Sequence, residues 1–173
     1  MKQVRLTIQL VLFLLLAILW QVPHSAHAAA VRAGQAAPNF KVITTSGQTV
    51  TLENYNSHVL VIDFFATWCA PCRQSVPHLV ALNSKYGKQG LQVLGLSADE
   101  DGERLLRAFS TEHRINYPLA VAGESVQADY GVRSVPVMFV LDKKGNVAEI
   151  YRGFSDEKGR SMERLIKNLL VEK

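Results

Sequence analysis

Two cysteines, Cys69 and Cys72, are the only ones in this chain of 173 residues, and just two residues separate them. A thiolate that accumulates near neutral pH attacks a disulfide, and a second thiol close by displaces the product from the mixed disulfide. A pair with this spacing provides both groups. The spacing therefore predicts a redox-active dithiol.

The segments around the pair favour the same chemistry. Residues 59–65 are β-branched and aromatic, which predicts a buried strand, and apolar residues recur at helical spacing over residues 71–86. Cys69 then falls at a helix start, where free backbone N–H groups and the helix dipole stabilise a thiolate. We expect Cys69 to be the nucleophile and Cys72, one helical turn on, to be the resolving cysteine.

Zinc binding and a structural disulfide are two other uses of such a pair. A structural zinc ion needs four ligands, but the chain has no second cysteine pair, and the nearest histidine, His78, lies within the predicted helix. A structural disulfide that closes so short a loop would stabilise little. We therefore predict no metal at this site.

Asp63 interrupts the apolar strand six residues before Cys69. Burying a carboxylate is costly unless it is paired or protonated, so a buried Asp63 would have a partner or a chemical task. The alternative is that Asp63 points to the sheet surface and is solvated or salt-bridged. We favour the chemical task.

The sequence D-F-F-A-T-W-C-A-P-C at residues 63–72, followed by Pro77, resembles the thioredoxin active-site signature. Together with a secretory N-terminus, it is similar to the TlpA/ResA-like thiol-disulfide oxidoreductases of bacterial envelopes. The resemblance extends from about Gly34 to the C-terminus. It implies a thioredoxin-like α/β fold: a central mixed β-sheet with helices on both faces, an N-terminal β extension and a central helix–strand insertion.

The resemblance also implies roles for individual residues. Asp63 matches the buried aspartate of thioredoxin and would accept the proton of Cys72. Pro136 matches the cis-proline that faces the dithiol, and the backbone of Val135 would pair with an extended substrate segment. From the sequence alone, Pro136 could instead simply open the strand predicted at 137–141.

Three further residues belong to the expected site. Trp68 is predicted to form an apolar rim beside Cys69 that packs against partner proteins, the alternative being core packing. Ala70 and Pro71 separate the cysteines and are expected to tune the redox potential, since Pro71 lacks an N–H. The chain departs from many ResA-like reductases, which have glutamate where it has Ser75.

Residues 34–40 also resemble the opening of peroxiredoxins, which suggests a peroxidase as a rival. Peroxiredoxins place their reactive cysteine in the context Pro-x-x-x-Thr-x-x-Cys, and no proline lies four residues before Thr67. The peroxidase interpretation is therefore weak.

The first 28 residues have the pattern of a secretory signal. Lys2 and Arg5 precede an apolar run at 10–20, and Ala-His-Ala at 26–28 matches a signal peptidase site. The alternative is an uncleaved membrane anchor; both place the domain in the periplasm or another extracytoplasmic space. The predicted organisation is a signal at 1–28, a linker at 29–35 and a thioredoxin-like domain at 36–173.

The composition limits the partners. The formal net charge of +4 includes two basic residues and no acidic ones from the predicted signal, so the mature protein would carry about +2. Nothing indicates a nucleic-acid surface. We expect no cofactor other than the Cys69–Cys72 disulfide, and membrane contact only through an uncleaved N-terminus.

The remaining chain predicts strands at 48–52, 91–97, 117–121, 137–141 and 147–151, and helices at 103–113 and 156–171. Leu105, Leu106 and Phe109 form the expected apolar face of the first of these helices.

The resemblance implies reduction of disulfides in exported proteins, for example apocytochrome c, with electrons from a membrane thiol donor. The direction of electron transfer depends on the reduction potential of the cysteine pair relative to its compartment, so an oxidase of folding exported proteins is the nearest alternative. A copper(I) metallochaperone is an alternative of another class, because thiolates suit that ion. Copper-assembly relatives space their cysteines by three residues and add a distant histidine, which argues against it.

Overall fold

A five-stranded mixed sheet forms the centre of the computed structural model, which describes residues 30–99 and 102–172. The strand order is β5-β4-β3-β6-β7. Strand β3 (Val59–Phe65) is central, parallel to β4 (Leu91–Ser97) and antiparallel to β6 (Val137–Leu141). Strands β5 (Leu119–Val121) and β7 (Val147–Arg152) form the two edges.

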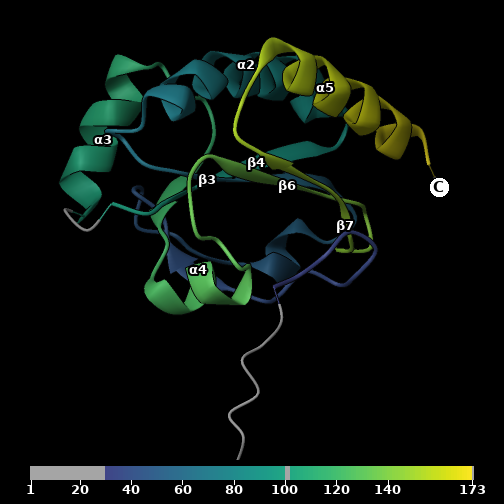
Figure 1. The fold of residues 1–173 in the computed structure, drawn as a ribbon, viewed down its shortest axis with the longest axis horizontal. Helices are drawn as coiled ribbons and strands as arrows, with labels where there is room; N and C mark the ends of the chain where they lie inside the picture. The colour runs from purple at the N-terminus through teal and green to yellow at the C-terminus, as the bar shows by residue number, and fades with distance from the viewer. Residues whose placement is uncertain (1–29, 100–101, 173) are drawn as a thin grey trace, which may run out of the picture.

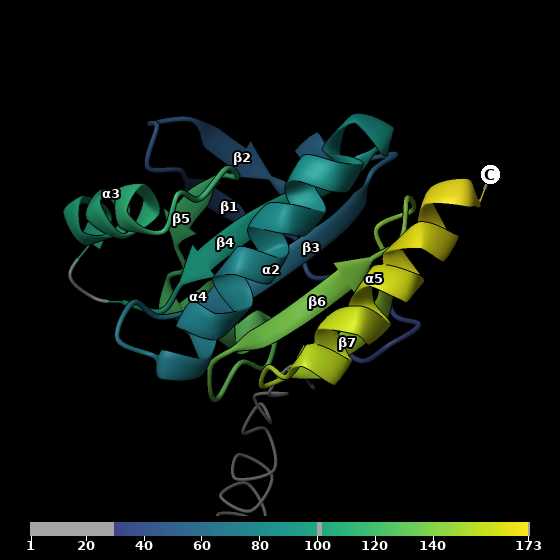
Figure 2. The ribbon, with the colours of Figure 1, turned by 90° about the horizontal axis from the view of Figure 1, so that it is seen from above.

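Helices cover both faces of this sheet. Helices α2 (Ala70–Tyr86) and α5 (Asp156–Val171) lie on one face, and α3 (Gly102–Glu112) stands beside α2 near β5 (Figures 1 and 2). The opposite face carries helix α4, a small antiparallel sheet of β1 and β2, and the 3-10 turn η1; a second such turn, η2, follows α2. Their bounds are Glu124–Asp129 for α4, Lys41–Ile43 for β1, Thr49–Thr51 for β2, Leu52–Tyr55 for η1 and Gly87–Gln89 for η2.

Strand β3 is buried along its whole length because the sheet has a core on each side. Val59, Val61 and Phe65 pack into the core under α2 and α5, whereas Leu60, Ile62 and Phe64 pack into the core on the α4 side. A strand covered on both faces reads as an uninterrupted apolar run. Asp63 is two residues from both Val61 and Phe65, so its side chain lies on the same face of the sheet as theirs, the face that α2 covers.

The observed architecture confirms the predicted fold class. Strands β1 and β2 form the N-terminal extension, and α3 with β5 forms the central insertion. The predicted strand at 48–52 ends one residue early because Leu52 opens the turn η1, and the strand predicted at 117–121 begins only at Leu119. Leu106 and Phe109 of α3 are buried, but Leu105 is 37% exposed because it lies about 100° around the helix from Leu106.

The segment predicted as a linker contacts the domain where it is described. The Gly34 N–H donates to the Val147 carbonyl (2.7 Å), the Val147 N–H donates to the Gln35 carbonyl (2.8 Å), and Val31 is buried. The predicted signal at 1–28 lies outside the described residues. In the described part of the chain, none of the helices is both long and apolar enough to span a membrane.

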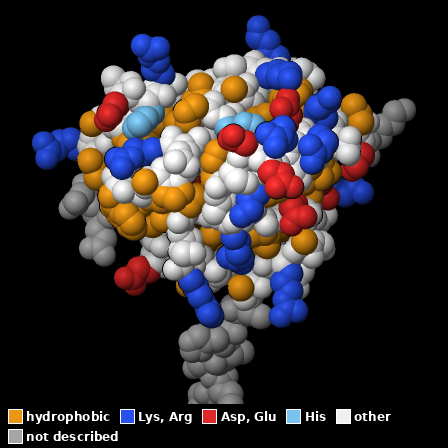
Figure 3. All heavy atoms as spheres, turned by 45° about the horizontal axis from the view of Figure 1, so that its top comes forward, with side chains coloured by type: hydrophobic (Ala, Val, Ile, Leu, Met, Phe, Trp, Pro, Cys, Tyr) orange, Lys and Arg blue, Asp and Glu red, His pale blue; other side chains and the backbone are white. Residues whose placement is uncertain are grey.

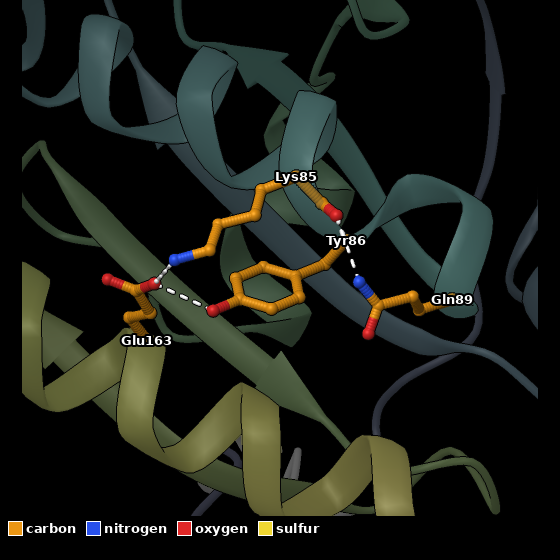
Figure 4. A network of polar contacts seen from close by, with 4 residues as sticks. All are labelled: Lys85, Tyr86, Gln89 and Glu163. Atoms are coloured by element: carbon orange, nitrogen blue, oxygen red, sulfur yellow. Dashed lines mark hydrogen bonds and ion pairs between the residues drawn. The ribbon is translucent and has the colours of Figure 1, made fainter.

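The far end of α2 is tied to α5 (Figure 4). The Tyr86 hydroxyl and the Lys85 ammonium both donate to one carboxylate oxygen of Glu163, at 2.7 and 2.8 Å. These bonds lower the pKa of the Glu163 carboxyl. Gln89 donates to the Lys85 carbonyl (3.1 Å) and closes the helix end. The network anchors the helix whose other end carries the cysteines.

Candidate active site

A disulfide joins Cys69 and Cys72 where β3 passes into α2 (S–S 2.22 Å, Cα–Cα 5.2 Å). Cys69 is the N-cap of α2, with extended backbone angles, and its sulfur accepts a hydrogen bond from the Cys72 N–H at 3.3 Å. In the reduced state this donor and the helix dipole would both stabilise a Cys69 thiolate. The predicted position of the pair at a strand–helix junction is confirmed.

The two cysteines differ in their exposure to solvent. Cys69 is 5% exposed, whereas Cys72 is fully buried. An external disulfide can therefore approach Cys69 but not Cys72. This difference supports Cys69 as the attacking residue and Cys72 as the residue that completes the exchange from within.

Val135 and Pro136 lie directly beside the dithiol. Their peptide bond is cis, as the resemblance implies, and the Val135 carbonyl oxygen lies 3.8 Å from the Cys69 sulfur. Pro136 immediately precedes β6, and its carbonyl accepts a hydrogen bond from the Gly153 N–H (2.8 Å). The two residues, 66 and 67 positions from Cys69 in sequence, thus form a backbone edge next to its sulfur.

Trp68 is 71% exposed, so it forms a rim and does not pack in the core. It borders a pocket of about 420 Å³ that reaches the Val135 backbone and is lined by Trp68, Ala98, Gln127, Val132, Arg133, Ser134 and Val135. Figure 3 turns the side of α2 and α5 toward the viewer, with an apolar area at its left and mixed charges over its right. The pocket therefore lies between the exposed Trp68 ring and the Val135 backbone, next to the dithiol.

Asp63 is 1% exposed, which excludes the solvated alternative. Neither carboxyl oxygen has a hydrogen-bond partner among the described residues, and burial raises the pKa of Asp63 from 3.8 to about 7. Its neighbours across the sheet are Gly95 and Met138. Burial, and secondarily the nearby Asp63, also raises the pKa of Tyr117. A carboxyl with a pKa near neutral is suited to accept a proton, and Val61 and Phe65, on either side of Asp63 on this face, pack into the core that contains Cys72.

The residues between and just after the cysteines form the first turns of α2. Ala70 and Pro71 form the exposed first turn of α2, where proline fits because its missing N–H needs no partner. Ser75 is buried, and its hydroxyl donates to the Cys72 carbonyl (2.8 Å). At the position where the resemblance to ResA-like proteins leads one to expect glutamate, this chain therefore has a neutral hydroxyl that is hydrogen-bonded within the helix.

Asp99 is a site residue that the sequence analysis missed. It is 5% exposed, and its carboxylate accepts hydrogen bonds from the Thr67 N–H (2.9 Å), the Thr67 hydroxyl (3.0 Å) and the Ser97 hydroxyl (2.6 Å). Thr67 and Asp99 each follow one of two adjacent parallel strands, whose carboxyl ends meet at one sheet edge. That juxtaposition could have been inferred from the predicted strands.

Within residues 30–99 and 102–172, no group of three or more His, Cys, Asp or Glu side chains is arranged to hold a metal ion. The Cys69–Cys72 pair is the reactive group at the carboxyl end of β3.

Fold and dithiol together define a thioredoxin-like thiol-disulfide oxidoreductase. Comparison with known proteins agrees: the model of the AhpC/TSA family matches residues 33–150, and the chain belongs to this family. It is 32% identical over 129 residues to the thioredoxin-like protein YneN of Bacillus subtilis, covering 74% of this chain and 76% of YneN. It is also 32% identical over 117 residues to the thiol-disulfide oxidoreductase ResA of Bacillus thuringiensis (strain Al Hakam), covering 67% of each.

Solved structures show the same relationship. A Chlorobium tepidum protein described as a thiol:disulfide interchange protein DsbE superposes with a TM-score of 0.77 at 28% identity, covering 82% of this chain and 99% of its own. A second thiol:disulfide interchange protein from Chlorobium tepidum TLS superposes with a TM-score of 0.70 at 25% identity, covering 82% of this chain and 99% of its own.

Proposed function

We propose that this oxidoreductase works outside the cytoplasm and reduces disulfides in exported proteins through a Cys69/Cys72 cycle. The observation that carries this proposal is the asymmetry of the pair. Cys69 sits at the helix N-terminus with a backbone donor on its sulfur, beside an open pocket, while Cys72 is sealed behind it. This arrangement suits one attacking thiol and one resolving thiol.

In the first step the Cys69 thiolate attacks one sulfur of a client disulfide. The client S–S bond breaks, its second sulfur leaves as a thiolate that takes a proton from solvent, and a Cys69–client mixed disulfide remains. Trp68 and the backbone of Val135 and Pro136 would hold the client segment during this attack, with main-chain pairing as in strand addition.

In the second step Cys72 gives its proton to the Asp63 carboxylate, and the resulting thiolate attacks the Cys69 sulfur. The mixed disulfide breaks and the client sulfur leaves as a thiolate, which is then protonated. The client has gained two electrons, and the enzyme now carries the Cys69–Cys72 disulfide. A membrane thiol donor would return two electrons to the enzyme and complete the cycle.

The proposed location rests on the sequence pattern of residues 1–28 and on the resemblance to envelope oxidoreductases. Cytochrome c maturation is the client pathway we favour, with apocytochrome c cysteines as substrates. The reductive direction also comes from the resemblance. An oxidase of folding exported proteins would use the same groups in reverse, so the potential of the pair distinguishes the two functions.

The test is the reduction potential of the domain without residues 1–28, measured by equilibration with glutathione and dithiothreitol buffers. We expect a value near the thioredoxin figure of about −270 mV, which supports a reductase. A value near about −120 mV would instead identify an oxidant of exported proteins. A pair that does not cycle reversibly at all would refute the redox role.

A further inference from the structure

We propose that Asp99 is a positioning residue for the active-site turn, which it holds so that Cys69 and Trp68 face the client. The proposal rests on the proposed role of Cys69 and adds to it a residue on another strand. Asp99 is too far along the chain to belong to a local motif with Thr67, since the two residues are 32 positions apart.

The turn that Asp99 holds is short. Strand β3 ends at Phe65 and α2 begins at Ala70, and within the turn the Cys69 N–H donates to the Ala66 carbonyl (3.1 Å). Thr67 lies in the middle of this turn. Its N–H and hydroxyl are two donors, and both point to Asp99.

Asp99 is itself anchored by hydrogen bonds at the end of β4. The Asp99 carboxylate accepts from the Ser97 hydroxyl, and the Asp99 N–H donates back to the same oxygen (3.0 Å). Ser97 is fully buried and pairs with Phe65, and the Ala98 N–H donates to the Phe65 carbonyl (2.8 Å). The end of β4 is therefore fixed to the end of β3, and Asp99 transmits that fixed position to Thr67.

The hydrogen bonds from Thr67 to Asp99 position both Trp68 and Cys69. Thr67 precedes Trp68 and Cys69, so its position determines where the exposed ring and the sulfur stand relative to Val135. Ala98, next to Asp99, lines the same pocket as Trp68. Without Asp99, the part-buried N–H and hydroxyl of Thr67 would lose their acceptor and the turn would rearrange. The N-terminal N–H groups of α2 would then be aimed less well at the Cys69 sulfur.

The test compares Asp99→Ala with Asp142→Ala, a matched control. Asp142 also holds a turn, accepting from the N–H groups of Lys144 and Asn146 (2.9 Å each), but it follows β6 at the end opposite Pro136. For each reduced variant, the rate of Cys69 alkylation by iodoacetamide is measured against pH, with the label located by mass spectrometry. The rate of insulin disulfide reduction is measured at pH 7.

We expect Asp99→Ala to raise the pH midpoint of Cys69 alkylation by about half a pH unit or more and to slow insulin reduction about 10-fold. Asp142→Ala should leave both unchanged, even where both variants lose similar stability. Asp99→Asn, which keeps an acceptor oxygen, should restore part of the rate. Thr67→Val, which replaces the hydroxyl with a methyl group, should shift the midpoint in the same direction by less. This variant leaves Asp99 in place and carries the test if Asp99→Ala does not fold.

An Asp99→Ala or Thr67→Val variant that matches the Asp142 control in midpoint and rate would overturn the inference. So would a lowered midpoint, because it would mean that Asp99 acts through its charge and not through position. If wild-type Cys69 titrates as an ordinary thiol and reduces no insulin, the proposed function itself fails, and this outcome is distinct from the other two.

Discussion

Asp63 lies directly opposite Gly95 in the parallel pair of β3 and β4, so the buried carboxyl has no side chain beside it on that strand. The space that a side chain at Gly95 would take is filled by Leu119, Phe65 and Tyr117. The carboxyl is thus enclosed by apolar and aromatic groups. This enclosure is the physical reason that its pKa rises to about 7.

Replacing Asp63 with asparagine should stabilise the oxidised protein at pH 8 but not at pH 3. The folded protein keeps the Asp63 proton up to about pH 7, whereas the unfolded chain loses it above 3.8, so this group makes stability fall as pH rises between those values. Each pKa unit corresponds to about 1.4 kcal/mol, so the gain above pH 7 should reach roughly 4 kcal/mol.

Urea unfolding at several pH values measures this difference. A gain of the same size at pH 3 and pH 8 would show that titration of Asp63 is not its source. Glu149→Gln, on β7, serves as a carboxyl-to-amide control outside this core.

Gly95→Ala should destabilise the protein by about 1–3 kcal/mol, because a Cβ there would lie 2.4 Å from Leu119 and 3.2 Å from Phe65. Thermal or urea unfolding gives the value. Gly123→Ala is the matched control, since a Cβ at Gly123 meets no atom within 4 Å. Equal losses in the two variants would contradict the packing explanation.

Cys72→Ser should trap the Cys69–client mixed disulfide, because no internal thiol remains to displace the client. Cys69→Ser should form no such adduct, since Cys72 is fully buried. Incubation of each reduced variant with an oxidised client peptide, followed by non-reducing electrophoresis and mass spectrometry, detects the adduct. Equal trapping by both variants would refute the assigned roles.

Trp68→Ala should lower kcat/KM for protein disulfides about 10-fold, chiefly through KM, because it removes an exposed aromatic surface beside Cys69. Stability should change little, since the side chain is 71% exposed. Ile43→Ala removes another apolar side chain of similar exposure, 65%, from β1 and should leave kcat/KM unaltered. An unchanged kcat/KM in Trp68→Ala would exclude the ring from client binding.

The dithiol could be predicted from sequence because its geometry is local. Residues 59–65 and 71–86 carry strand and helix patterns of their own, and Cys69 and Cys72 lie at the boundary between them. The resemblance added the cis bond before Pro136, which the structure contains. The buried position of Asp63 is also predictable, because the carboxyl interrupts an otherwise apolar strand and matches the buried aspartate of thioredoxin.

Other features depended on how distant segments meet. The exposure of Trp68 and Leu105 follows from which side of a turn or helix the neighbouring elements cover, and sequence spacing alone does not specify it. The bonds of Asp99 to Thr67 and the approach of Val135 to Cys69 join residues 32 and 66 positions apart. Amino-acid patterns determine the type of each element through local backbone preferences and apolar spacing. The register of β4 and β6 against β3, set by packing of the whole core, decided which polar groups surround the two sulfurs.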